Sequence, residues 1–531
     1  MTRKQPNILF ILTDEQRADH LGCYGNSILQ TPNIDSIANQ GVAYDRFYTA
    51  VPVCMPNRAS IATGRLPSAH GVRQNGIPLS LESTTFVDIL TAGGYSTAAI
   101  GKLHLQNIGN APIYERSKPG KKGQLSPPEL LRESYKLDRQ TDLYKAENIE
   151  AWRNDPQRKI NTPYYGFDHV RICSGDGDMV EGHYTSWAND RHADVSSLRG
   201  PENAFPAEDY SVPQAYRTRM PEELYPTKYI AEETISFLSD HAQNTDDQPF
   251  FIHCSFPNPH HPFSPPGKYW DMYNPDDIEL PPSFDWKMPD NLPPVPGIKE
   301  GFERGRKEPN AFWPIEVTER QAREAIALTY GMISMIDDAV GEILASLNSF
   351  GLSENTIIIF ASDHGDYMGD QGMLLKLGLH RHSTIRMPFI WCDLNLARTS
   401  ERDGRLASTI DIAPTILDAA GLRPYHGIQG FSLLDKVKIR EGVVIEDYGV
   451  GVFRDPDAVA GMLTYVTDQW RMTIFEGTNW GELYNLVDDP DEVKNLWNNK
   501  NSQAIKNELN NGLIHELINL RDRSASPTGQ G

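Results

Sequence analysis

Four short, almost continuous apolar runs, each ending in polar residues, constrain the fold of this chain more than any other feature. They are NILFILTD from Asn7, YSTAAIGK from Tyr95, PFFIHCSF from Pro249 and NTIIIFASD from Asn355. Strands that are apolar along their whole length are typical of a mostly parallel sheet that is buried on both faces. The segment 320–350 repeats apolar residues at helical spacing. We therefore expect an α/β fold with a large, mostly parallel central sheet flanked by helices.

The last hundred residues have a different pattern. GVVIEDYGV, AGMLTYVTD and QWRMTIFEG are short runs separated by turn-like residues, and a terminal helix is expected over 504–521. This pattern predicts a small antiparallel sheet, so we expect a catalytic α/β domain over 1–430 and a C-terminal α+β subdomain over 431–531. The stretch 107–223 is polar and rich in Pro, Gly and aromatic residues, which favours long loops and insertions that shape a substrate pocket.

Charge and composition exclude several kinds of partner. The net charge of -21 argues against nucleic acid, and the basic run KPGKKG from Lys118 is expected to be a solvated loop. No stretch approaches the roughly 20 apolar residues of a membrane span. The first apolar run ends directly in Asp14 and Glu15, without the cleavage site of a signal peptide. Five scattered cysteines indicate a reduced protein, so we expect a cytoplasmic location.

Two of the four apolar runs end in acidic groups. The first run supplies Asp14 and Glu15, and the fourth supplies Asp363, His364 and Asp366. Ligands of open α/β sheets gather at the carboxyl ends of the strands, so these groups can converge. Oxygen ligands with one imidazole suit Ca²⁺, Mg²⁺ or Mn²⁺. Either group alone is explained by carboxylates at a strand end that cap the following helix. The two groups together favour a divalent-metal site.

Basic and imidazole groups follow the other strand ends. The residues concerned are Lys102 and His104 after the second run, His260 and His261 after the third, and Lys376, His380 and His382 beyond the fourth. Any one of them can be an ordinary surface or core residue. As a set they predict a cationic pocket for an oxyanion inside a strongly acidic protein.

The stretch CMPNR, from Cys54 to Arg58, poses a separate question about the role of its thiol. A phosphatase loop with a cysteine and an arginine needs five residues between them, whereas here there are three and one is proline. A Cys/His protease dyad has no local signature in this sequence. The remaining ordinary interpretation is a buried cysteine that packs as a small hydrophobe.

These features together resemble the formylglycine-dependent (type I) sulfatases of the alkaline phosphatase superfamily, which include arylsulfatases and are related to phosphonate monoester hydrolases. The similarity runs from PNILFILTDEQRADHLGCYGN through TPNIDSIANQGVAYDRFYTA to ELYNLVDDPDEVKNL. CMPNR, followed by ASIATGRLPSAHGV, matches the family's Cys-x-Pro-x-Arg signal. The resemblance implies that a formylglycine-generating enzyme converts Cys54 to formylglycine, whose hydrated aldehyde is the nucleophile.

The resemblance also implies roles for single residues. The groups similar to the ligands of one divalent cation, expected to be Ca²⁺ or Mn²⁺, are Asp14, Glu15, Asp363, His364 and the modified Cys54. Arg58 resembles the residue that supports the formylglycine. The groups similar to those that bind sulfate and assist the leaving alkoxide are Lys102, His104, His260 and Lys376. Many members have Asp in place of Glu15, Asn in place of His364 and a small residue in place of Met55. The resemblance therefore implies that a metal is bound, but it specifies less well which metal.

The reaction expected from the resemblance is the metal-assisted hydrolysis of a small-molecule or carbohydrate sulfate ester through a covalent sulfo-enzyme. Phosphonate monoester hydrolases and phosphodiesterases are the alternative, since they have a similar Asp-His pair and an asparagine like Asn75, a further candidate for substrate binding. They tend, however, to carry neutral hydroxyl side chains at the positions of Lys102 and His104, which favours a sulfatase. An inactive scaffold would lack a ligand or the modification signal, and this chain has both. Family members often form dimers or tetramers, so a homo-oligomer is expected.

Overall fold

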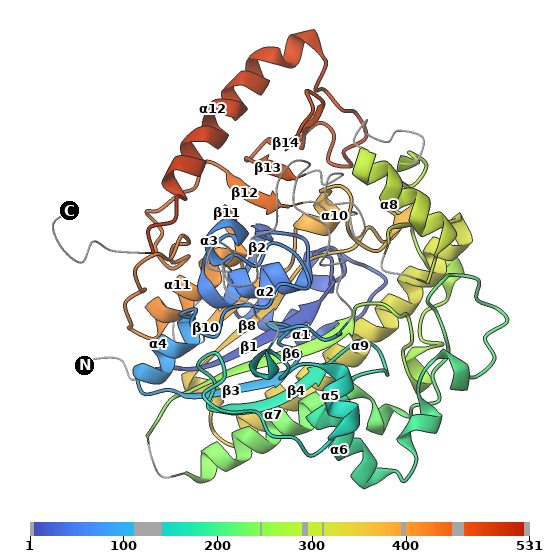
Figure 1. The fold of residues 1–531 in the computed structure, drawn as a ribbon, viewed down its shortest axis with the longest axis vertical. Helices are drawn as coiled ribbons and strands as arrows, with labels where there is room; N and C mark the ends of the chain where they lie inside the picture. Colours follow the sequence, from blue (N-terminus) through green and yellow to red (C-terminus); the bar gives the residue numbers. More distant parts are fainter. Residues whose placement is uncertain are drawn as a thin grey trace.

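A nine-stranded sheet forms the centre of the molecule (Figure 1). The structure is a computed structural model that describes residues 5–110, 141–244, 247–288, 296–310, 313–393, 400–448 and 461–524. The strands are β1 (Asn7–Asp14), β2 (Val42–Tyr48), β3 (Ser96–Gly101), β4 (His169–Ser174), β5 (Glu181–Gly182), β6 (Phe250–Pro259), β8 (Thr356–Ser362), β10 (Phe389–Asp393) and β11 (Glu401–Ser408), in the order β11-β2-β10-β8-β1-β6-β3-β4-β5. β10 and β5 run antiparallel to their neighbours, and the other pairings are parallel. The expected mostly parallel sheet is confirmed.

Side chains along β1 alternate between two cores, one on each face of the sheet. Leu9 and Ile11 belong to a core that includes residues of α1 (Pro32–Asn39), α7 (Pro226–Gln243) and α9 (Glu319–Ser349). Ile8, Phe10 and Leu12 belong to a second core with residues of α2 (Cys54–Thr63), α4 (Phe86–Ala92) and α11 (Ile412–Ala419). A strand covered by helices on both faces is apolar along most of its length, which explains the run from Ile8 to Leu12 in β1.

Each of the four apolar runs forms a strand, and these four strands are neighbours in the order β8-β1-β6-β3. All three pairings among them are parallel. Their carboxyl ends therefore meet at one edge of the sheet, where the polar residues that follow them are brought together. The helix expected over 320–350 is α9.

The stretch 107–223 contains more regular structure than the long loops we expect from its sequence. It includes α5 (Ile149–Asn154) and α6 (His183–Arg191), and β4 and β5 extend the central sheet. β4 is six residues long and half of it is polar, so its short sequence does not stand out from a loop. Its strand conformation follows from backbone pairing with β3, a tertiary contact. The basic run at Lys118 lies outside the described residues.

The C-terminal part forms the expected antiparallel sheet. Its strands are β12 (Val443–Asp447), β13 (Met462–Val466), β14 (Trp470–Phe475) and β15 (Gly481–Asn485), each paired antiparallel to the next, and the terminal helix is α12 (Gln503–Asn519). Figure 1 shows this unit at one end of the molecule, beyond the central sheet. The division of the chain at residue 430 stays a prediction.

A buried network of charges joins the C-terminal sheet to the segment that carries Lys376. Arg381 lies 2.7 and 2.8 Å from the two carboxylate oxygens of Glu482. Glu482 also pairs with Arg471, which contacts Glu492. Because burying an unpaired charge is costly, this network holds the segment after β8 in one position relative to the C-terminal sheet.

The remaining short elements are β7 (Ile315–Glu316), β9 (Met373–Leu374), α3 (Pro67–His70), α8 (Pro296–Lys307) and α10 (His382–Ile385). None of the described helices combines the length and the apolar composition needed to cross a membrane.

Candidate active site

The candidate residues converge at the carboxyl edge of the four central strands. Asp14 ends β1 and Glu15 follows it, while Asp363 and His364 follow β8. The other strand ends supply His260 and His261 after β6, and Lys102 and His104 after β3. Cys54 is the first residue of α2, whose N-terminus faces the same edge.

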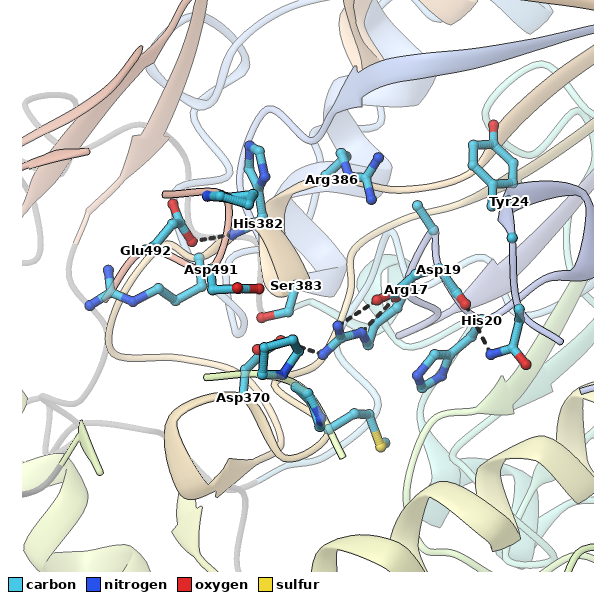
Figure 2. A pocket seen from close by; sticks show the side chains of 18 of the residues that line it. Arg17, Asp19, His20, Tyr24, Asp370, His382, Ser383, Arg386, Asp491 and Glu492 are labelled. Carbon is cyan, nitrogen blue, oxygen red and sulfur yellow. Dashed lines mark hydrogen bonds and ion pairs between the residues drawn. The ribbon is translucent and has the colours of Figure 1, made fainter. Parts of the chain in front are cut away.

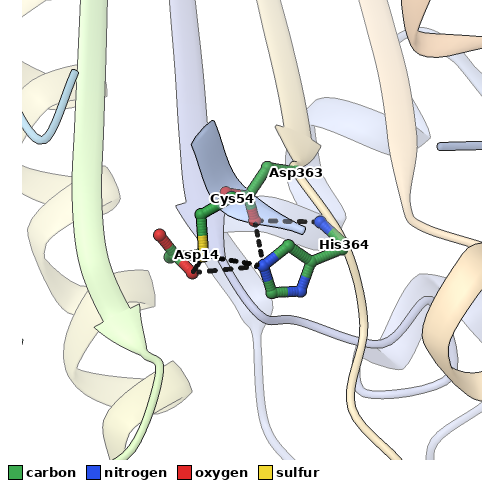
Figure 3. A group of neighbouring side chains, drawn as sticks. All are labelled: Asp14, Cys54, Asp363 and His364. Atoms are coloured by element: carbon green, nitrogen blue, oxygen red, sulfur yellow. Dashed lines mark hydrogen bonds and ion pairs between the residues drawn. The ribbon is translucent and has the colours of Figure 1, made fainter. Parts of the chain in front are cut away.

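Four of these residues form a compact cluster (Figure 3). One ligand atom each of Asp14, Cys54, Asp363 and His364 lie within 4.8 Å of one another, and all four residues are buried. Cys54 Sγ lies 3.1 Å from His364 Nε2 and 3.7 Å from Asp14 Oδ1. His364 Nδ1 lies 3.0 Å from the carbonyl oxygen of Gly365, to which it donates, so Nε2 presents its lone pair to the cluster. Two carboxylates and an imidazole with this tautomer fit a divalent cation.

Arg58 binds both carboxylates of this cluster. Its guanidinium donates to Asp363 Oδ2 at 2.8 Å and to Asp14 Oδ2 at 3.0 Å. It also donates to the carbonyl oxygen of Lys102 at 2.6 Å, which ties the end of β3 to the same group. Burial raises the pKa of Asp14, but Lys102 and Arg58 together bring that pKa well below its usual range. The Asp14 carboxylate is thus held ionised, as a metal ligand must be.

Glu15 turns towards a second group of side chains. Its Oε2 lies 3.0 Å from His260 Nε2, 3.2 Å from His261 Nδ1 and 2.7 Å from Lys376 Nζ. The structure therefore brings Glu15 together with His260, His261 and Lys376, while the compact cluster contains Asp14. The expected role of Glu15 as a metal ligand stays a prediction.

His260 and Lys376 form a hydrogen-bonded pair. Lys376 Nζ lies 2.7 Å from His260 Nε2, and a hydrogen bond at this distance needs a lone pair on one of the two nitrogens. Burial lowers the pKa of His260, whereas the carboxylates of Asp176 and Glu15 raise it above its usual range. The pair consequently carries positive charge and a transferable proton.

Lys102 and His104 approach the cluster from the end of β3. Lys102 Nζ lies 2.9 Å from Asp14 Oδ2 and also contacts Asp176 Oδ1. Burial and the charges of Lys102 and Arg58 lower the pKa of His104 well below its usual range, so its imidazole is neutral. Asp176 was not among the residues selected from the sequence. The glycines on either side of it, in the stretch SGDGD, are the signal that could have drawn attention to it.

Three further candidates have other contacts. Asn75 Oδ1 accepts a hydrogen bond from the backbone amide of Met55 at 3.1 Å, so Asn75 supports the start of α2. His380 Nδ1 lies 2.7 Å from Thr464 Oγ1, and His382 Nε2 lies 3.2 Å from the Tyr48 hydroxyl. His380 and His382 therefore make contacts outside the compact cluster. A substrate contact by Asn75 stays a prediction.

Buried Glu147 holds the loop that carries His104. Its Oε1 accepts hydrogen bonds from the backbone amides of Leu105 and Gln106 at 3.0 and 3.1 Å and from the Tyr164 hydroxyl at 2.9 Å. Burial raises the pKa of Glu147 from 4.5 to about 7. The insertion thus contributes a buried anchor for a catalytic candidate.

Glu147→Gln is expected to change how stability depends on pH. Because the folded-state pKa is raised, the folded protein binds this proton more tightly than the unfolded chain, and the resulting stability is lost as pH rises towards 7. Between pH 5 and pH 8 the free energy of unfolding of the wild type should fall relative to Glu147→Gln by about 2 to 3 kcal/mol. Urea unfolding at the two pH values measures this. The exposed variant Glu82→Gln serves as the control, and identical pH dependence in all three proteins would contradict the expectation.

A cavity of about 690 Å³ lies apart from this site (Figure 2). Its lining comes mainly from the segments 17–28, 381–386 and 490–492, and it does not include Cys54. Arg17 in this cavity is already paired, 2.6 Å from Asp19 and 2.5 Å from Asp370. We therefore place the chemistry at Cys54, where a thiol, carboxylates and cationic side chains converge, and not in this cavity.

Comparison with known proteins identifies the family of the chain. Residues 6–422 match the family model described as Sulfatase, and residues 369–519 match the model described as N-sulphoglucosamine sulphohydrolase, C-terminal. The arylsulfatase of Clostridium perfringens (strain 13 / Type A) is 30% identical over 523 residues, which is 97% of this chain and 94% of that protein.

Solved structures share the fold. The phosphonate monoester hydrolase of Agrobacterium radiobacter superimposes with a TM-score of 0.75 at 22% identity, covering 98% of this chain and 97% of that one. BT4656, solved in complex with its substrate D-glucosamine-2-N,6-O-disulfate, superimposes with a TM-score of 0.68 at 20% identity, covering 97% of this chain and 98% of that one. These matches confirm the expected alkaline-phosphatase-like architecture.

Proposed function

The chain belongs to the sulfatase family of sulfuric ester hydrolases, in the alkaline phosphatase superfamily, and we propose that it hydrolyses sulfate esters with a formylglycine made from Cys54. The observation that carries this proposal is the position of Cys54. It combines the modification signal CMPNR with a location 3.1 Å from His364 and 3.7 Å from Asp14, beside the groups that suit a divalent cation.

The donor set supports one divalent cation at this position. Asp14, Asp363, His364 and an oxygen of the modified Cys54 would hold it, and Ca²⁺ or Mn²⁺ suits these oxygen and imidazole donors. When bound, such an ion supplies positive charge that lowers the pKa of a neighbouring hydroxyl group. Arg58, which bridges Asp14 and Asp363, holds the two carboxylates in place.

The chain's own residues supply the remaining steps. Lys102 and the pair of His260 and Lys376 hold the negatively charged ester group. One hydroxyl of the hydrated aldehyde gives up its proton to solvent and attacks sulfur as the alkoxide. The bond between sulfur and the ester oxygen breaks, and that oxygen leaves with a proton from the pair. The second hydroxyl then loses its proton, for which neutral His104 is the acceptor. The aldehyde re-forms as the bond between carbon and the sulfated oxygen breaks and sulfate departs.

Phosphonate monoester or phosphodiester hydrolysis is the second candidate. The structural neighbour from Agrobacterium radiobacter is a phosphonate monoester hydrolase, and this chain resembles such enzymes at Asp363, His364 and Asn75. Lys102 and His104, both buried beside the cluster, favour sulfate esters, because the phosphonate monoester hydrolases that this chain resembles tend to carry neutral hydroxyl side chains at these two positions.

Small-molecule or carbohydrate sulfate esters are the proposed substrates, and a formylglycine-generating enzyme is the proposed partner. The arylsulfatase relative and the neighbour solved with a disulfated glucosamine support this range. The structure has its five cysteines unpaired, in keeping with the proposed cytoplasmic location. A dimer or tetramer stays a prediction from the family.

The proposal is tested by assaying one preparation, with the mass of the Cys54 peptide recorded, against an aryl sulfate, a phosphodiester and a phosphonate monoester. We expect the highest kcat/KM for the sulfate. A preference for either phosphorus ester would overturn the use of Lys102 and His104 as sulfatase markers. A preparation with a confirmed aldehyde that is inactive on all three would overturn the hydrolase function for these substrates.

A further inference from the structure

A tight loop of the insertion places the side chain of Asp176 beside Lys102 and His260, two of the groups proposed to hold the ester. The stretch Gly175-Asp176-Gly177 joins β4 to β5, and both glycines have left-handed backbone angles, φ of 103° and 59°. A Cβ on Gly177 would lie only 2.8 Å from Pro262, which follows the two histidines at the end of β6. Only glycine allows this conformation and this close approach, so Asp176 is held at the tip of the loop.

The loop is anchored independently of Asp176. The carboxylate of the neighbouring Asp178 accepts hydrogen bonds from the Tyr216 hydroxyl at 2.5 Å, from the Thr218 hydroxyl, and from the backbone amide of Gly200. These contacts fix the loop to the rest of the insertion. The side chain of Asp176 is consequently not needed to hold the loop in place.

Asp176 contacts two of the groups proposed to hold the ester. One carboxylate oxygen contacts Lys102 Nζ, and the other lies 3.7 Å from His260 Nδ1. Any anion that Lys102 and His260 hold must therefore lie close to a negative charge. A pocket intended for the strongest possible anion binding would have no such carboxylate beside its cations.

The other carboxylates of the site differ from Asp176 in their surroundings. Asp14, Glu15 and Asp363 have side chains that are 0 to 1% exposed, and each is paired with Arg58, Lys376 or Lys102 on the inner side of the site. The side chain of Asp176 is 13% exposed, so it faces the more open side. Among the described residues of the site, Asp176 is the acidic group best placed to meet the charge of an incoming ester.

We infer that Asp176 sets the charge selectivity of the site, favouring esters whose transferred group carries one negative charge over dianionic phosphate monoesters. Sulfate monoesters, phosphodiesters and phosphonate monoesters carry one charge on that group, and phosphate monoesters carry two above about pH 6. The second charge meets the carboxylate of Asp176 at short range, where like charges repel strongly. Selectivity arises from repulsion of the wrong substrate. This inference rests on the proposed function, because it assumes that Lys102 and His260 hold the ester.

The test compares four substrates with the same 4-nitrophenolate leaving group: the sulfate, the phosphate monoester, a phosphodiester and a phosphonate monoester. In Asp176→Asn at pH 8.5, we expect the ratio of kcat/KM for sulfate to that for the phosphate monoester to fall about tenfold to hundredfold. Asp176→Glu should stay within about threefold of the wild-type ratio, because it keeps the charge. Asp190→Asn, which removes one charge from the exposed surface of the same insertion, should leave the ratio unchanged.

A pH series gives a readout that a purely structural role would not produce. As pH falls through about 6, the phosphate monoester takes up a proton and becomes singly charged. The difference between wild type and Asp176→Asn in this ratio should therefore shrink at low pH. Thermal unfolding of each variant, with Asp176→Ser as a second neutral replacement, verifies that the loop is intact.

Equal loss of activity on all four substrates in Asp176→Asn would overturn the inference and leave Asp176 as a residue that only positions Lys102 and His260. A wild type that prefers the phosphate monoester would overturn it as well. A wild type that prefers the phosphodiester over the sulfate would overturn the proposed function alone, since charge selectivity is then measured between the phosphodiester and the phosphate monoester. Inactivity on all four substrates, with the aldehyde confirmed, would overturn both.

Discussion

Cys54→Ala is expected to lower kcat/KM for an aryl sulfate by about 10³-fold or more while leaving the fold intact. The replacement removes the only side chain that the modification signal can convert into a nucleophile. Cys54 is 2% exposed, and its thiol contacts only side chains of the site itself among the described residues: His364, Asp14 and His260. Alanine fills most of the same space, so the loss of activity should far exceed the loss of stability.

Three measurements on the same preparation separate the possible causes. The assay measures kcat/KM, the mass of the peptide 47–58 reports conversion of Cys54, and thermal unfolding reports folding. Cys23→Ser, at a partly exposed cysteine distant in sequence from the signal, is the matched control and should keep its activity. If Cys54→Ala retained more than about a tenth of wild-type activity, Cys54 could not be the source of the nucleophile.

Asp363→Asn is expected to remove the bound divalent metal and to lower kcat/KM by about 10²-fold or more. Asp363 provides one oxygen of the compact cluster, and its other oxygen accepts from Arg58 at 2.8 Å. The asparagine amide is neutral, so it lacks the negative charge that attracts both the metal ion and the Arg58 guanidinium. Because Arg58 is then left buried with one partner fewer, unfolding should also become easier by about 3 kcal/mol.

Metal analysis of the purified protein and the effect of a chelator on thermal unfolding test this expectation. A chelator should lower the unfolding temperature of the wild type and have little effect on Asp363→Asn, because ligand binding stabilises only the protein that binds it. Asp411→Asn is the matched control, since it breaks another buried ion pair of the chain, in which Arg440 Nη2 donates to Asp411 Oδ1 at 2.8 Å. It should cost similar stability and keep its metal. Unchanged metal content in Asp363→Asn would exclude Asp363 as a ligand.

Much of the fold could be predicted because burial leaves a direct trace in a sequence. A strand covered on both faces is apolar along most of its length, so β1, β3, β6 and β8 are visible as apolar runs. α9 is visible because one long helix repeats its buried positions at a fixed spacing. β4 and β5 do not stand out in the sequence because they are short. β4 owes its conformation to pairing with β3, which is distant in the chain, and β5 in turn pairs with β4.

The site, like the fold, was predictable from the sequence only in part. Residues at the ends of the four central strands were expected to converge, and the structure brings Asp14, Asp363 and His364 together with Cys54. The direction of the Glu15 side chain, towards His260 and Lys376, could not be predicted, because it depends on a left-handed backbone angle of 65° and on partners from two other strands. Asp176 could not be predicted for a similar reason, because its contacts depend on the position that a glycine-flanked loop of the insertion takes relative to Lys102 and His260.

The sequence by itself determined the class of fold, the strands that carry the chemistry and the signal at Cys54, because periodic burial and a short contiguous motif are local properties of the chain. Tertiary structure alone decided which carboxylates face the compact cluster, that His260 and Lys376 lie 2.7 Å apart, and that Asp176 lies beside Lys102. Coulomb and hydrogen-bond energies depend on distances between atoms, and those distances join residues separated by dozens to hundreds of positions along the chain.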